Sequence, residues 1–129
     1  MQARHYVAFA DGRAESGLES VGRWRMYQAQ LPPPELQVVL RDADGVIGRV
    51  DFHWKAYRTV GEADGSSKYR SADGTADFAA LRQEKLREDR LRDCGEEVFR
   101  FTWDEAVRRP VVLEQRARRV ARGLARRAD

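Results

Sequence analysis

Apolar residues gather in three neighbouring segments near the middle of the chain, each short enough to be a strand. The run Leu36–Leu40 leads into the turn Asp42-Ala43-Asp44-Gly45, after which a second run extends from Val46 to Trp54. A turn of the Asp-Gly kind between two such runs predicts an antiparallel hairpin. A third strand is expected over Tyr57–Glu62. The middle of the chain is therefore predicted to be a three-stranded meander.

A helical pattern precedes the meander. Ser16 is a candidate cap, and Glu19 stands three residues later as in a capping box. The three prolines Pro32–Pro34 end this helix. We expect residues 1–14 to form an N-terminal extension or linker and residues 15–129 to form one domain.

Beyond the meander the pattern changes again. Residues 65–74 are rich in serine, aspartate and glycine, which predicts a loop. A charged helix is expected over Asp77–Asp93, and Glu97–Trp103 is the clearest strand in the chain. Pro110 opens a last helix over residues 110–128. The predicted fold is α/β, a small mixed sheet of about four strands in the order helix, three strands, helix, strand, helix, with the helices on its faces.

Length and composition fit one small folded domain. The chain has 129 residues, of which 42% are hydrophobic and 35% charged. No apolar run approaches the roughly 20 residues of a membrane span, and the first residues lack the apolar core of a signal peptide, so we expect a cytoplasmic protein without a membrane partner. The single cysteine, Cys94, excludes an internal disulfide and is expected to be a small buried hydrophobe.

The charge is unevenly distributed. The net charge is +3, but residues 108–129 carry eight arginines against two acids, which is +6 and leaves −3 for residues 1–107. The basic character therefore belongs mostly to the last helix. That helix is interpreted either as a solvated face or as a phosphate-binding surface, with nucleic-acid contacts from Arg116, Arg119, Arg122 and Arg126.

Three acids stand where two of the predicted strands end. Asp51 lies in the second strand, and Glu62 and Asp64 close the third, on the face that Val60 begins. An acid on a buried face is costly unless something binds it. Three carboxylates at one sheet edge are typical of a metal site, although Asp51 also fits a solvated strand face and Asp64-Gly65 an ordinary turn.

Several short motifs, taken together, resemble a known family. They occur in the following order: Glu19-Ser20, Leu36-Gln37-Val38, Gly48-Arg49-Val50-Asp51-Phe52, Gly61-Glu62-Ala63-Asp64-Gly65, Lys68-Tyr69, Glu84-Lys85-Leu86-Arg87-Glu88-Asp89 and Arg100-Phe101-Thr102-Trp103. The chain resembles the PD-(D/E)XK nuclease superfamily, in the branch similar to very-short-patch-repair endonucleases. That branch is often C-terminal in actinobacterial proteins related to abortive-infection type IV antitoxins.

This resemblance implies a restriction-endonuclease-like fold and hydrolysis of DNA phosphodiesters with Mg²⁺ or Mn²⁺. Asp51, Glu62 and Asp64 are the implied metal ligands, and Glu19 is either a further site residue or only a helix cap. The family's lysine, two residues after the third-strand acid, is replaced here by Asp64. Lys68 or Lys85 is therefore expected to supply that charge, and we favour Lys68 because its loop begins close to Asp64.

Two other functions fit the same sequence. One is a catalytically silent nuclease-like fold that binds nucleic acid or a protein partner, and the other is an RNA-directed toxin module. A homodimer is compatible with either. The tryptophans Trp24, Trp54 and Trp103 are expected in the core rather than on a base-stacking surface.

Overall fold

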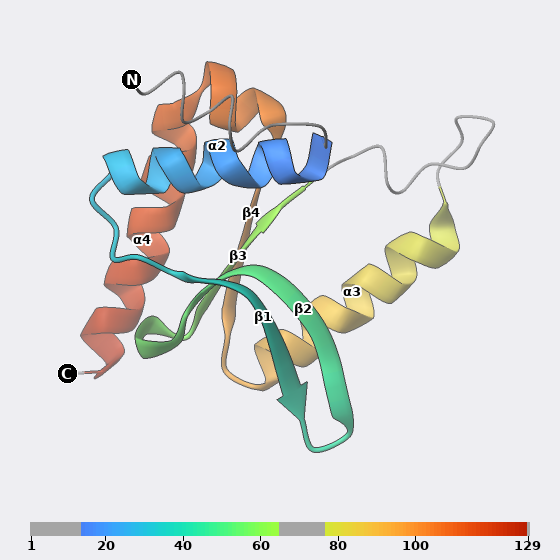
Figure 1. Cartoon of the computed structure of the whole chain (residues 1–129). Helices are drawn as coiled ribbons and strands as arrows, with labels where there is room; N and C mark the ends of the chain where they lie inside the picture. Colours follow the sequence, from blue (N-terminus) through green and yellow to red (C-terminus); the bar gives the residue numbers. More distant parts are fainter. Residues whose placement is uncertain (1–13, 65–76, 129) are drawn as a thin grey trace.

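The computed structural model describes residues 14–64 and 77–128, and within them the side chains of residues 17–64 and 77–123. The elements confirm the predicted α/β class and the predicted order (Figure 1). In chain order they are α2 (Ala14–Gln28), β1 (Glu35–Asp42), β2 (Gly45–Trp54), the 3₁₀ turn η1 (Lys55–Tyr57), β3 (Thr59–Ala63), α3 (Phe78–Asp93), β4 (Glu97–Phe101), the π-helical turn η3 (Asp104–Arg108) and α4 (Pro110–Ala128).

The four strands form one mixed sheet in the order β1-β2-β3-β4. The first two pairs are antiparallel, and β3 pairs with β4 in parallel, so the chain crosses over through α3 between them. The hairpin between β1 and β2 turns where the Asp-Gly signal predicted it. Asp44 donates its backbone N–H to Asp42 Oδ1 (2.9 Å), and Gly45 takes a φ of +116° that favours glycine.

Helices cover both faces of the sheet (Figure 1). On one face α2 and α4 pack over Phe52, Phe99 and Phe101, which belong to the larger apolar cluster together with Leu18 and Leu113. On the other face α3 packs through Leu91, in a smaller cluster that is completed by Ile47, Val50, Val60 and Val98. Since β3 and β4 lie between both layers, their side chains alternate between the two clusters.

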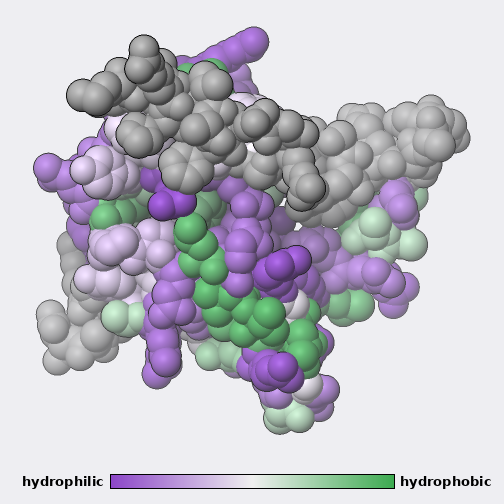
Figure 2. Space-filling model, viewed as in Figure 1, coloured by the Kyte–Doolittle hydropathy of each residue, from purple (hydrophilic) through white to green (hydrophobic). Residues whose placement is uncertain are grey.

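The projecting hairpin keeps apolar side chains at the surface. Figure 2 shows hydrophobic side chains along it among hydrophilic neighbours, and its exposed apolar residues are Leu36, Val39 and Val46. Leu36 and Val39 are on β1, which is an edge of the described sheet, and Val46 is in the part of β2 that is not paired with β3. Among the described helices, none combines the length and apolar character that crossing a bilayer needs.

Five expectations need correction. Helix α2 begins at Ala14, so Ser16 lies inside it rather than at its cap. The third strand begins at Thr59 because η1 takes up the preceding residues, and the fourth ends at Phe101. Cys94 is exposed at the C-terminal cap of α3 rather than buried. Trp103 is 43% exposed, whereas Trp54 is in the core as expected.

Candidate active site

The candidate site lies where β2 and β3 separate. The register pairs Phe52 with Gly61, and its continuation would place Asp51 opposite Glu62. There the backbone pairing ends, and Ala63 instead donates its N–H to Asp51 Oδ2 at 2.9 Å. Burial raises the pKa of Glu62, and the negative charge of Asp51 adds to that rise, as expected of two carboxylates that lie near one another. Folding thus brings Asp51 and Glu62 together at one end of the sheet.

A third acid reaches the same place from α2. Gln37 donates through Nε2 to Glu19 Oε2 at 2.8 Å, and the same nitrogen lies 3.5 Å from Asp51 Oδ1, at the outer limit of a hydrogen bond. A small cavity of about 80 Å³ lies at this junction, lined by Glu19, Ser20, Arg23, Leu36, Gln37, Asp51 and Phe52. Glu19 is therefore part of the acid cluster and not a helix cap.

The reach of Gln37 depends on an unusual backbone conformation. Gln37 has a φ of +52°, in the left-handed region, inside β1. A non-glycine residue in that region is uncommon and costs of order 1 kcal/mol or more, so the surrounding contacts must hold it. Gln37 belongs to the motif Leu36-Gln37-Val38, but no site role was predicted for it.

Glu62 is bound by an arginine. Its residue is 6% exposed, and Arg87 from α3 holds it through two contacts, Nη1 to Oε1 at 2.7 Å and Nη2 to Oε2 at 3.1 Å. This is the bidentate geometry of an ionised pair. Burial raises the pKa of Glu62 above its ordinary value of 4.5, and the contacts with Arg87 limit that rise.

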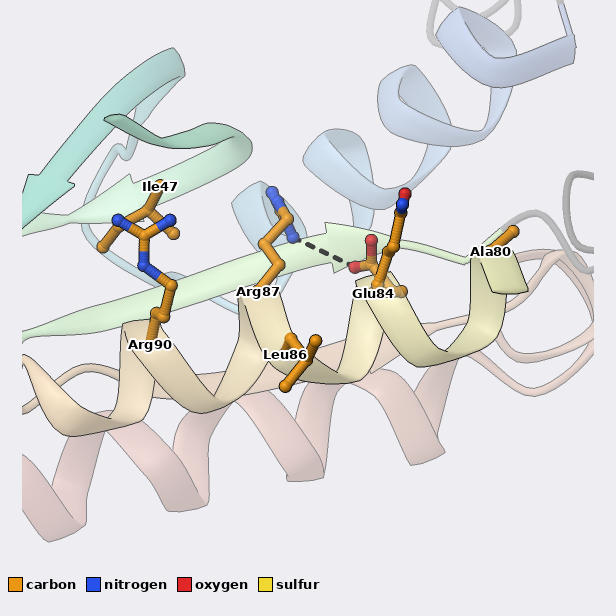
Figure 3. A pocket seen from close by; sticks show the side chains of 7 residues that line it. Ile47, Ala80, Glu84, Leu86, Arg87 and Arg90 are labelled. Atoms are coloured by element: carbon orange, nitrogen blue, oxygen red, sulfur yellow. Dashed lines mark hydrogen bonds and ion pairs between the residues drawn. The ribbon is translucent and has the colours of Figure 1, made fainter. Parts of the chain in front are cut away.

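Arg87 has little freedom left for a substrate. Nη1 also donates to Glu84 Oε1 at 3.0 Å (Figure 3). Nη2 donates to the carbonyl of Arg49 at 2.7 Å, so both terminal nitrogens are engaged. Its path crosses Gly48, where a Cβ would stand 2.8 Å from Arg87 Nε. Gly48 therefore makes room for the guanidinium. No local pattern in the sequence indicates this role.

A row of charges extends from this pair along α3. Arg100 on β4 donates to Glu84 Oε1 at 2.5 Å and to Glu88 Oε1 at 3.0 Å, and its Nη2 lies 3.9 Å from Glu62 Oε1. Burial works against the charge of Arg100, but these acids outweigh it and raise its pKa. Glu62 is thus the buried end of an alternating acid and arginine network.

Asp64 follows β3 directly and differs from Glu62 in its partners. Its N–H donates to the carbonyl of Phe101 at 2.8 Å, which ties the end of β3 to β4. Its Oδ1 is buried, and no hydrogen bond reaches it within the described residues. A buried carboxylate oxygen without a donor is costly, so Asp64 offers an acceptor at the end of β3 that nothing within the described residues satisfies.

Of the two candidate lysines, Lys85 belongs to the described residues and Lys68 does not. The side chain of Lys85 is 75% exposed on α3, and its Nζ lies 3.6 Å from Asp89 Oδ1 one turn later. Such a pair between residues one turn apart is an ordinary contact on a helix surface.

The arginines of α4 divide into two groups. Arg116 Nη1 donates to the carbonyl of Arg100 at 2.6 Å, and its Nη2 to Glu105 Oε2 at 2.5 Å, so it fastens α4 to the sheet. Burial alone would raise the pKa of Glu105, but hydrogen bonds from Arg116 and Thr102 outweigh it, so the pKa of Glu105 is lowered. Arg119 and Arg122 are exposed. The side chain of Arg126 lies outside the described residues.

Comparison with known proteins identifies relatives but no function. Two uncharacterized proteins, from two strains of Mycobacterium tuberculosis, are each 37% identical to the chain over 124 residues. The match covers 96% of this chain and 42% of each relative, so the chain spans about two fifths of the length of the curated relatives it matches. No family model and no solved structure matches the chain.

Proposed function

We propose that the protein is a metal-dependent endonuclease-like domain that hydrolyses phosphodiester bonds in DNA. The observation that carries the proposal is that Asp51 on β2 lies near Glu62 on β3, where the two strands separate, and shares the amide of Gln37 with Glu19 from α2. Bringing several carboxylates together in a folded protein costs free energy unless they bind something. The resemblance to PD-(D/E)XK nucleases supports the same reading.

The residues present fit a Mg²⁺ or Mn²⁺ ion. Mg²⁺ is commonly bound by one or two carboxylates and keeps several waters. Asp64 Oδ1 is a buried acceptor without a donor among the described residues, and Asp51 Oδ1 has one long contact with Gln37. Within residues 17–64 and 77–123, no group of three or more His, Cys, Asp or Glu side chains is placed to hold a metal. We propose Asp51 and Asp64 as the pair of ligands, because Asp51 Oδ1 has only a long contact and Asp64 Oδ1 has no donor among the described residues.

The bound ion would polarise a phosphate oxygen and make a nearby water easier to deprotonate. The chain's own residues would do the rest. The Ala63 N–H fixes Asp51, and Arg87 fixes Glu62 beside it, so both carboxylates are oriented before substrate arrives. Lys68 is the proposed cation that orients the attacking water or stabilises the charge that develops on phosphorus.

The proposed substrate is DNA, acted on in the cytoplasm. Its phosphates would be met by the exposed arginines of α4, Arg119 and Arg122, whereas Arg116 is engaged within the fold. Such contacts give affinity without sequence preference. RNA is the alternative substrate.

A silent, nucleic-acid-binding version of this fold is the second candidate, and one observation favours it. Glu62, the acid of the third strand, is already neutralised by Arg87 and needs no metal to be stable in the interior. In that case the acid cluster would be a structural remnant and the arginines of α4 the functional surface.

The test is incubation of the purified protein with supercoiled plasmid and, in parallel, with structured RNA. Each is followed with Mg²⁺, with Mn²⁺ and with a chelator. The proposal expects nicked or linear plasmid only when metal is present. Uncut plasmid in all conditions, with DNA still bound, would establish the silent fold, and cleavage restricted to RNA would establish the toxin alternative.

A further inference from the structure

The outer face of α2 continues away from the acid cluster. Glu19, Arg23 and Tyr27 are spaced four residues apart, so they stand one above the other on the helix over about 12 Å. Arg23 lines the small cavity that also contains Glu19 and Asp51. A stripe therefore leads from the carboxylates, past a guanidinium, to an exposed aromatic ring.

Tyr27 is a ready stacking surface. Its residue is 73% exposed, although it is large and carries an aromatic ring. One side of the ring rests on Trp24, with the ring centroids 5.7 Å apart and the planes 27° from parallel. Trp24 is itself half-buried, so it holds the tyrosine ring in place. A ring supported on one side and open to solvent on the other can accept a second flat ring.

A groove lies beside this ring, where α2 is followed by the prolines. This end of α2 is at the left of Figure 1. Its volume is about 570 Å³, within the range of small-ligand sites. The lining combines apolar surface with amides and one guanidinium: Arg23, Met26, Tyr27, Gln28, Gln30, Leu31, Pro32, Pro33 and Pro34. Arg23 lines both this groove and the small cavity at Asp51, so the two are neighbours along α2.

We propose that this groove, which we call the Tyr27 groove, is a subsite for an unpaired nucleobase of the DNA strand that enters the acid cluster. This inference rests on the proposed function, because it places the base next to the phosphate at Asp51. The base would stack on Tyr27, and the adjoining phosphate would lie against Arg23. The side-chain amides of Gln28 and Gln30 each offer donors and an acceptor to a base edge.

The chemistry of the groove favours a nucleotide over an apolar peptide. An aromatic platform beside a positive charge is the combination by which proteins hold single strands, since every base has a π face and every linker a phosphate. Stacking on Tyr27 needs a base that is out of its duplex, so the subsite selects frayed, flipped or single-stranded DNA over fully paired DNA.

The experiment measures binding of a single-stranded oligonucleotide carrying 2-aminopurine, in the presence of a chelator so that nothing is cleaved. Stacking on Tyr27 should quench the fluorescence of the 2-aminopurine on binding. Tyr27→Ala should weaken binding by roughly five- to a hundredfold and abolish the quenching. Tyr27→Phe should keep both. Phe78→Ala is the matched control, because Phe78 is an equally exposed aromatic residue, 79% accessible, on α3 away from the groove.

The outcomes separate this inference from the proposed function. If Tyr27→Ala binds and quenches like the wild type, or if the wild type binds no single strand, the subsite is wrong even if plasmid is cleaved. If the wild type binds with Tyr27-dependent quenching but leaves plasmid uncut, the endonuclease proposal fails and the subsite stands. An equal loss in Tyr27→Ala and Phe78→Ala would also overturn the subsite, because it would show a general loss of exposed apolar surface.

Discussion

Replacing Arg87 with methionine tests whether the buried pair with Glu62 holds the sheet and α3 together. The side chains of Arg87 and Glu62 are 18% and 8% exposed, and the two make a bidentate contact. Removing one partner of such a pair leaves an uncompensated buried charge, at a cost of about 3–5 kcal/mol. A domain of this size has a total stability of about 5–15 kcal/mol. We therefore expect Arg87→Met to unfold at a much lower urea concentration than the wild type near pH 7.5, as measured by tryptophan fluorescence.

The pH dependence distinguishes this cause from a simple loss of packing. Because burial raises the pKa of Glu62 in the folded protein, the stability contributed by its neutral form is present below the unfolded value of about 4.5 and is lost as pH rises through the folded pKa. In Arg87→Met the contacts that limit the rise are gone, so that pKa is higher still. Arg87→Met should become more stable as pH falls from about 8 to about 5, and approach the wild type.

Arg90→Met is the matched control, since Arg90 stands one turn later along α3 and makes a bidentate contact with Asp42 at 2.9 and 2.6 Å. Hydrogen bonds from Arg90 lower the pKa of Asp42 below 3.8, so that pair loses its contribution only at lower pH. The deficit of Arg90→Met should stay constant from about pH 8 to about pH 5. If Arg87→Met unfolds at the wild-type midpoint, or if its deficit does not shrink at about pH 5, the reasoning about Glu62 is wrong.

Two further outcomes follow from the site. Lys68→Ala should slow plasmid cleavage by roughly a hundredfold, whereas Lys85→Ala should leave the rate nearly unchanged because Lys85 is exposed and paired on α3. Cleavage rates of both variants check this, and the reverse result would assign the catalytic role to Lys85. The double variant Arg119→Ala/Arg122→Ala should reduce the slope of log affinity for DNA against log salt concentration by somewhat under two, as measured by fluorescence anisotropy. Arg116→Ala should instead lower the melting temperature, because Arg116 is bound within the fold. An unchanged slope would mean that α4 is only a solvated face.

The fold could be predicted because most of its elements depend on short stretches of sequence. Examples are the turn at Asp42–Gly45, the apolar run over β4 and Pro110 at the start of α4, each of which determines the structure of only the few residues around it. The strand ends differ from the prediction, because η1 takes Tyr57 into a 3₁₀ turn and β4 ends at Phe101, two residues before the expected end. A strand pattern does not show where hydrogen-bonded pairing stops, since that depends on the neighbouring strand.

The site was only half visible in the sequence. The acids Asp51 and Glu62 could be found because polar residues in buried strands stand out. Arg87 and Gln37 could not, since each acts across a distance in sequence, 25 residues to Glu62 and 18 to Glu19, and nothing local distinguishes them from other polar residues. Among 21 arginines, the one that binds a buried acid is identified by packing and not by composition.

The rate of metal-dependent plasmid nicking by Asp51→Asn tests the central proposal most directly. This variant keeps the size of the side chain and one acceptor for the Ala63 N–H, but removes the charge that a cation needs. Asp44→Asn, in the exposed hairpin turn, is the control. We predict that Asp51→Asn loses at least about a hundredfold in rate while Asp44→Asn stays at the wild-type rate and both melt normally. Equal nicking by the wild type and a well-folded Asp51→Asn would contradict the account.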